Sequence, residues 1–177
     1  MGAAWRDHGM TVLYAVLVLP VLGVVAYRWR RRGTSRRNAL AEIGLVAGTL
    51  PWLVMLFTPQ PAGRSLQLVP LRDLLSWGSP GFGTALAQTV GNLLVLAALG
   101  FFAPIRSAAM TSLTRVLAVA AASAVVIEAL QWLLMIGRVS SIDDVLVNTL
   151  GAGLAALSSR RWWRAPERPP SRILNAR

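Results

Sequence analysis

The sequence predicts an all-α protein, a polytopic bundle of about five transmembrane helices with its N-terminus outside the cell and its C-terminus in the cytoplasm. The composition supports this class, because 55% of the 177 residues are hydrophobic and only 14% are charged. The apolar runs are long enough to cross a bilayer core of about 30 Å. Arginine clusters directly follow the first and last runs, as expected for cytoplasmic membrane flanks.

The placement of charges and the scarcity of reactive side chains exclude several function classes. A net charge of +11 favours nucleic-acid binding only if the basic residues form one surface, whereas here they gather after apolar runs, at Arg28–Arg37 and Arg160–Arg177. We therefore expect the lipid bilayer, and no nucleic acid, as a partner. The chain has no cysteine, and its one histidine, His8, lies in the N-terminal tail, which excludes disulfides, thiolate metal sites and histidine-based triads. We expect no metal site and no cofactor.

The first two apolar runs predict two helices joined by a cytoplasmic loop. Met10–Tyr27 is followed by several arginines and preceded by one, which is the reverse of a cleaved signal peptide, so we expect a stop-transfer helix. Ala39–Phe57 then returns outward, with a kink expected at Pro51. Glu42 lies near the cytoplasmic end of this run, where we expect it to reach the headgroups without a functional role.

The rest of the chain predicts an outside loop, three further helices and a basic tail. Residues 58–83 are rich in glycine and proline and form the loop, and their middle, Leu66–Trp77, is amphipathic enough to lie at the membrane interface. The three apolar runs that follow are Thr84–Ile105, Leu113–Ile136 and Ile142–Leu157. We therefore divide the chain into two N-terminal helices (1–65), a helical region of an outer loop and three helices (66–157), and a basic cytoplasmic tail (158–177).

Polar side chains within the last three runs predict a pocket that faces outward. At a rise of about 1.5 Å per residue, they fall at similar depths in the outer half of the membrane. Charged groups at such depth are costly and usually face the bundle interior. The pocket candidates are Asn92, Glu128, Gln131, Arg138, Asp143, Asp144 and Asn148, with Arg72 and Gln88 as secondary candidates. Arg138 is placed to pair with Asp143, Asp144 or Glu128.

Structural interpretations compete with this pocket. The amides of Gln88, Asn92, Gln131 and Asn148 are also the kind of group that forms hydrogen bonds between membrane helices. Asp143 is also placed to cap the fifth helix, because an acidic residue at a helix start suits the free N–H groups. Glu128 is the residue least easily explained by structure alone, since it lies in mid-span among apolar neighbours.

The C-terminal half, roughly Leu66 to Leu157, resembles the VanZ family of bacterial membrane proteins. The segments that carry the resemblance are Gly91–Leu96 with Leu99–Phe101 and Pro104, the pair Glu128 and Gln131, Gly137–Arg138, Ile142–Gly151, and more weakly Leu68–Arg72. Gln67, Ser141 and Ala155 depart from the family, which usually has asparagine, a further aspartate and glycine there. The resemblance implies a bacterial plasma-membrane protein associated with reduced susceptibility to teicoplanin, a lipoglycopeptide that binds peptidoglycan precursors.

Three functional hypotheses follow. In the first, the pocket binds an amphiphile of the outer leaflet, whether an envelope lipid, a peptidoglycan precursor or the glycopeptide antibiotic, with Arg138 and Arg72 meeting its phosphate or carboxylate groups. In the second, the chain is an enzyme that modifies a lipid or precursor, with Glu128 or Asp144 as general base, although no established catalytic motif is present. The third is a small transporter or flippase. A purely structural membrane adaptor is the alternative to all three, and the sequence leaves the oligomeric state open.

Overall fold

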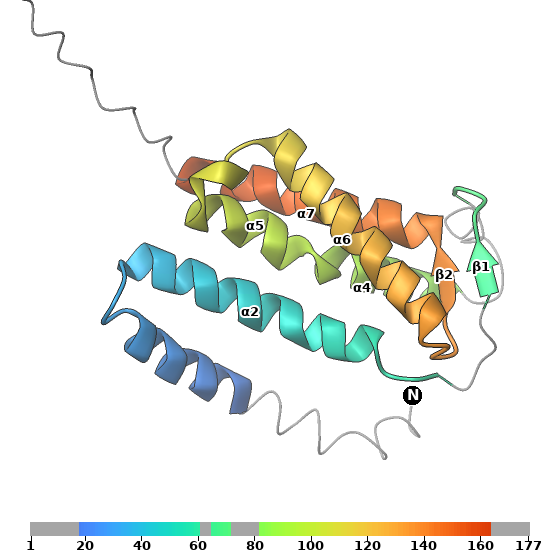
Figure 1. The fold of residues 1–177 in the computed structure, drawn as a ribbon, viewed down its shortest axis with the longest axis horizontal. Helices are drawn as coiled ribbons and strands as arrows, with labels where there is room; N and C mark the ends of the chain where they lie inside the picture. Colours follow the sequence, from blue (N-terminus) through green and yellow to red (C-terminus); the bar gives the residue numbers. More distant parts are fainter. Residues whose placement is uncertain (1–17, 61–64, 72–81, 164–177) are drawn as a thin grey trace, which may run out of the picture.

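The computed structural model describes residues 18–60, 65–71 and 82–163, and the described chain is predominantly helical (Figure 1). Residues 18–30 are helical and precede the first labelled element. The elements that follow are α2 (Arg36–Leu56), β1 (Ser65–Gln67), α4 (Phe82–Val95), α5 (Ala97–Arg106), η2 (Ala108–Met110), α6 (Leu113–Leu133), β2 (Val139–Ser141), α7 (Ile142–Ser159) and η3 (Arg160–Trp162). The predicted all-α class is confirmed.

Three helices are long and apolar enough to cross a membrane, namely Arg36–Leu56, Gln88–Arg106 (α4 and α5 together) and Leu113–Leu133. They correspond to the second, third and fourth predicted spans. The fifth predicted span is α7, which is not one of these three, and much of the first lies outside the described residues.

The outer faces of the helices are apolar, as expected for contact with lipid rather than water. On α7 the exposed large side chains recur every three or four residues, at Leu146, Leu150, Leu154 and Leu157. This spacing places them on one face of the helix. The opposite face of α7 is buried and consists mainly of small residues, including Gly151, Ala152 and Ala156. The bundle therefore packs through small side chains and presents its large apolar ones outward, which is typical of membrane helices.

The predicted span Thr84–Ile105 corresponds to Gln88–Arg106, and it is interrupted at Leu96 between α4 and α5. Both halves pack against α7, and two close backbone contacts flank the break. A Cβ added at Gly151 would lie 1.9 Å from the carbonyl oxygen of Leu93, and one added at Gly100 would lie 2.0 Å from that of Ala152. Only glycine permits contacts this close, so α4 and α5 each rest directly on the backbone of α7.

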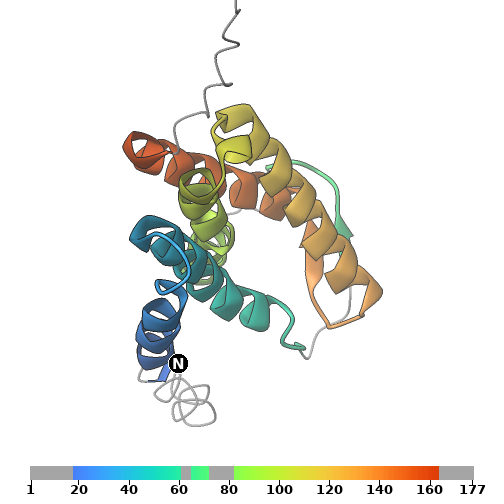
Figure 2. The same ribbon diagram turned by 60° about the vertical axis from the view of Figure 1, so that its left-hand side comes forward.

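Helix α2 packs on α5, both α4 and α5 pack on α7, and α7 packs on α6. Figures 1 and 2 agree that residues 18–30 lie beside α2 at the edge of the bundle, on the side away from α6. Successive spans run in opposite directions along the bundle, with α4 and α5 together forming one of them, so the bundle has two distinct ends (Figure 1). We call the end that carries β1 and β2 the strand end. We call the opposite end, where α2 and α6 begin and α5 and α7 finish, the arginine end.

Two short strands that the sequence did not predict join the loop after α2 to the turn before α7. β1 pairs in parallel with β2, with Ser65 opposite Val139 and Gln67 opposite Ser141. Nearby, the Gln60 N–H donates to the Ile136 carbonyl at 2.8 Å. The predicted outside loop is thus fixed to the end of the bundle where α6 finishes and α7 begins. Strands of three residues are too short to show a recognisable alternation in sequence.

Candidate functional site

A cluster of polar side chains occupies the strand end, between α4, α6, β2 and α7. We call Asn92, Glu128, Ser141, Asp143 and Asp144 the strand-end cluster. Glu128 comes from the penultimate turn of α6 and is only 8% exposed, and its Oε2 accepts a hydrogen bond from the Ser141 N–H at 3.1 Å. The Ser140 hydroxyl donates to the Glu128 carbonyl at 3.1 Å. The buried Glu128 carboxylate thus accepts a hydrogen bond from the backbone of β2, the strand that leads into α7.

Asp144 connects α7 to α4. The Asn92 amide, which is buried on α4, donates to Asp144 Oδ1. Glu128 binds the Ser141 N–H, three residues before Asp144, so both carboxyls lie at the start of α7. Two acidic groups and an amide from three helices therefore meet, as the depth of these positions in the sequence suggested. Asp144 is only half-buried, so of these carboxyls it is the one that a ligand from outside the bundle would meet first.

Asp143 holds the loop after β1 rather than capping its own helix. Its carboxyl is 2% exposed and its Oδ1 accepts from the Leu71 N–H at 2.5 Å. The cap of α7 is Ser141, whose hydroxyl accepts from the Asp143 N–H at 3.1 Å. The N-cap is therefore Ser141 and not Asp143, while Asp143 lies in the first turn, where its charge suits the helix dipole as expected. Serine suits the N-cap position because its short side chain reaches the free N–H groups of the first turn.

Gln131 and Arg138 point toward α2 instead of joining these carboxyls. Gln131 donates to the Leu56 carbonyl at 3.0 Å, and Arg138 donates through Nη2 to the Met55 carbonyl at 2.8 Å. Both acceptors lie in the last turn of α2, and the Met55 carbonyl also accepts from the Thr58 N–H at 3.3 Å. The ion pair expected for Arg138 is not formed within the described residues, although its charge still acts on Glu128 through space. Its Nε is buried without a hydrogen-bond partner.

The remaining predicted residues lie apart from this network or outside the description. Asn148 is 1% exposed on α7, and its Oδ1 has no hydrogen-bond partner. Gln88 is exposed on α4. Arg72 lies outside the described residues. In the part of the chain that the structure describes, no group of three or more histidine, cysteine, aspartate or glutamate side chains could hold a metal ion.

Glu42, for which the sequence suggested no role, joins three segments at the arginine end. Its Oε2 lies 2.5 Å from Arg30 Nε and its Oε1 lies 2.6 Å from Arg106 Nε. These arginines come from the stretch 18–30 and from the last residue of α5, so one carboxyl connects both to α2. The sequence analysis did not predict that Glu42 joins these segments. The only signal in the sequence was a lone carboxylate beside an arginine-rich loop.

These features define the class first: this is a helical membrane protein with buried small-residue packing and a polar cluster at one end. Residues 43–163, more than half of the 177-residue chain, match the VanZ/LLP1 family. The chain therefore belongs to the VanZ family, and the resemblance seen in its C-terminal half is confirmed and extends into α2. No curated protein and no solved structure matched the chain.

Proposed function

We propose that this VanZ-family protein acts at the bacterial cell envelope by binding the headgroup of an outer-leaflet amphiphile at the strand-end cluster. The observation that carries the proposal is the meeting of Glu128, Asp143 and Asp144 at one end of an otherwise apolar bundle, with Arg138 close by. Charged groups in membrane helices are rare, and most of them serve binding, transport or catalysis. The amphiphile is an envelope lipid, a peptidoglycan precursor or a lipoglycopeptide of the teicoplanin type.

The orientation of the bundle supports this location. The arginine end carries Arg36, Arg106, Arg115 and Arg160, whereas the strand end carries the carboxyls. By the positive-inside rule the arginine end belongs in the cytoplasm of the plasma membrane. The strand end then faces outward, toward the leaflet in which peptidoglycan precursors and glycopeptides meet.

The chemistry of the cluster fits a headgroup that is both charged and rich in hydroxyl or amide groups. Arg138 lies at the same end, bound through Nη2 to the Met55 carbonyl, and guanidinium groups match phosphate and carboxylate geometry well. Half-buried Asp144 offers an acceptor for hydroxyl and amide donors. The segment 65–71 lies over the same end and is held there by β2 and Asp143, so it is placed to contact the same headgroup.

Antibiotic susceptibility tests the proposal. Cells that express wild type, Asp144→Asn, Glu128→Gln or Arg138→Gln at matched membrane levels are challenged with teicoplanin and with a glycopeptide that has no lipid tail. We expect wild type to protect against teicoplanin more than against the other drug, and the three variants to lose most of that protection. Mass spectrometry of lipids and wall precursors then separates binding from catalysis, because only an enzyme changes their composition.

The matched controls change the same residue types at the arginine end. Glu42→Gln removes a carboxylate and Arg115→Gln removes an exposed guanidinium, and both leave the strand-end cluster intact. We expect both to protect like wild type. If Asp144→Asn and Glu128→Gln reach the membrane normally and still protect fully, the cluster is not a binding site and its role is structural.

A further inference from the structure

The arginine end contains an apolar cavity of about 450 Å³ between α2, α5 and η3. Leu40, Phe101, Phe102 and Trp162 line it, and Arg37 lies at its edge. The ring of Phe102 rests on α2 at Gly44, where an added Cβ would lie 2.3 Å from the ring. The Phe101 ring lies 5.7 Å from that of Trp162. Aliphatic side chains of α2 and aromatic rings of α5 and η3 thus form the walls of the cavity.

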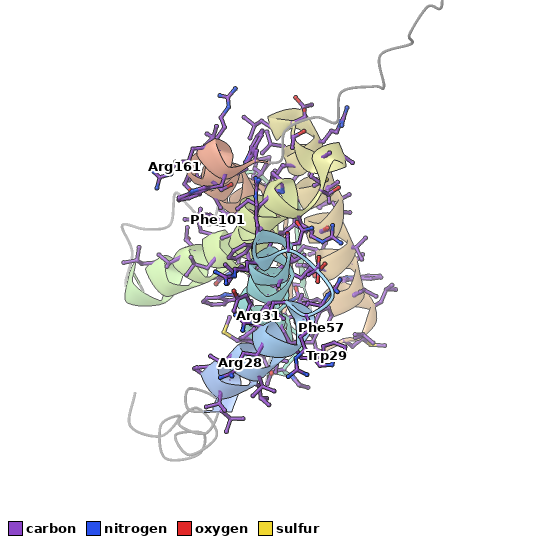
Figure 3. The ribbon with its side chains drawn as sticks, turned by 90° about the vertical axis from the view of Figure 1, so that its left-hand side faces the viewer. Arg28, Trp29, Arg31, Phe57, Phe101 and Arg161 are labelled. Atoms are coloured by element: carbon purple, nitrogen blue, oxygen red, sulfur yellow. The ribbon has the colours of Figure 1, made fainter. Side chains whose placement is uncertain are left out.

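The rim of this cavity is strongly positive. Arg161 stacks on the Trp162 ring at 4.0 Å, and Arg37 donates to the Trp162 carbonyl. Figure 3 looks onto this end and shows Arg28, Arg31 and Arg161 distributed across it. Within the described ranges Glu42 is the single carboxylate at this end, and it is already paired with two arginines. The guanidinium groups of Arg37 and Arg161 therefore have no carboxylate counterpart in the described chain.

We propose that this cavity binds one anionic phospholipid, with an acyl chain against the aromatic lining and the phosphate held by Arg37 and Arg161, joined by the exposed Arg160 at the start of η3. The cavity and its rim are each complementary to one part of such a lipid. An apolar cavity suits a hydrocarbon chain, and a rim with several guanidiniums suits a phosphate ester. Basic pockets on the cytoplasmic side of membrane helices have the chemistry to select anionic headgroups. The site lies at the opposite end from the strand-end cluster and does not depend on it.

Native mass spectrometry of the detergent-purified full chain tests this assignment by lipid titration. The probes are dioleoyl phosphatidylglycerol, dioleoyl phosphatidylcholine, glycerophosphoglycerol without acyl chains, and inorganic phosphate. We expect one phosphatidylglycerol to bind with about tenfold higher affinity than phosphatidylcholine, because the basic rim favours the anionic headgroup. The two soluble probes should bind at least about tenfold more weakly, since they cannot use the apolar cavity.

Two variants locate the site. Arg160→Gln with Arg161→Gln leaves the Arg37 contact to Trp162 intact, and Arg37→Gln with Arg161→Gln removes it. Both should lower phosphatidylglycerol affinity to that of phosphatidylcholine. Arg115→Gln, at the same end but outside the cavity lining, should bind like wild type. Equal binding of the two lipids by wild type, binding of the soluble probes as tight as that of the lipid, or full affinity in both variants would each overturn the proposal.

Discussion

Ser141 supports the strand end in two separate ways. Its backbone N–H binds Glu128, and its hydroxyl caps α7 through the Asp143 N–H. Only the second contact needs the side chain. The two contributions can therefore be separated by mutation, because replacing the hydroxyl leaves the Glu128 contact in place.

Ser141→Ala should lower the free energy of unfolding by about 1 kcal/mol, the usual cost of losing a helix N-cap. Thermal or denaturant unfolding in detergent measures it. Ser141→Thr should restore most of the loss, because threonine also caps helices. Ser158→Ala is the control, since that exposed hydroxyl only donates back within its own helix. Equal stability of Ser141→Ala and wild type would show that the cap contributes nothing here.

Glu42 is the corresponding residue at the arginine end, and its effect on stability should be modest. Its side chain is 23% exposed, and those of Arg30 and Arg106 are 37% and 39% exposed, so solvent screens both ion pairs. In a double-mutant cycle of Glu42→Gln and Arg106→Gln, we expect a coupling energy of about 0.5–1 kcal/mol that falls as salt is added. A coupling that does not change with salt would contradict an exposed ion pair.

Two close backbone contacts with α7 accompany the packing of apolar side chains in the core. Gly100 and Gly151 bring α5 and α4 onto α7 on both sides of the break at Leu96. Gly91 lies on the same helix as Leu93 but has nothing within 4 Å of an added Cβ. The chain therefore contains both test positions and a matched control of the same residue type.

Gly151→Ala and Gly100→Ala should each lower the free energy of unfolding by about 1–3 kcal/mol, because the new methyl group would meet a backbone carbonyl that cannot move aside. Gly91→Ala should be neutral or stabilise the protein by up to about 1 kcal/mol, as alanine favours helix more than glycine does. Unfolding temperatures in detergent compare the three. Equal unfolding temperatures of all three variants would show that the close contacts with α7 do not constrain these positions.

The sequence predicted the helices well and the connections between them poorly. Apolar runs of bilayer length can be recognised from local composition alone. The predicted bounds of α2, α6 and α7 therefore lie within a few residues of their bounds in the structure. The break at Leu96 was missed because neither proline nor glycine marks it, and it is visible only where α7 touches both halves. Asn92 and Asp144 were candidates because both are polar residues that the predicted topology places in the outer half of the membrane. The partners of Glu42 and Arg138 depend on how whole helices are placed, which spacing within one helix does not encode.

At the scale of the whole molecule, the two ends differ in charge, and this difference predicts the orientation in the membrane. The chain has no cysteine, so single cysteines can be introduced into the natural sequence. Met135, beyond the end of α6, is 67% exposed at the strand end, and Ala109 is exposed in η2 at the arginine end. Neither substitution removes an arginine.

A membrane-impermeant maleimide should label Met135→Cys in intact cells and label Ala109→Cys only after the membrane is opened. This pattern follows from the positive-inside rule applied to the arginine end. Wild type, which has no thiol, gives the background. The reverse labelling pattern would place the strand-end cluster in the cytoplasm and remove the proposed contact with outer-leaflet amphiphiles.

The pairing of β1 with β2 also dictates the order in which the protein is completed during synthesis. β1 and Leu71 have their partners in β2 and Asp143, and the Leu71–Asp143 contact joins residues 72 positions apart. A nascent chain that stops after α6 has already produced α2, α4 and α5, but it lacks β2 and Asp143, which bind β1 and Leu71. The contacts that complete the strand-end cluster therefore form only once β2 and the first turn of α7 have been synthesised.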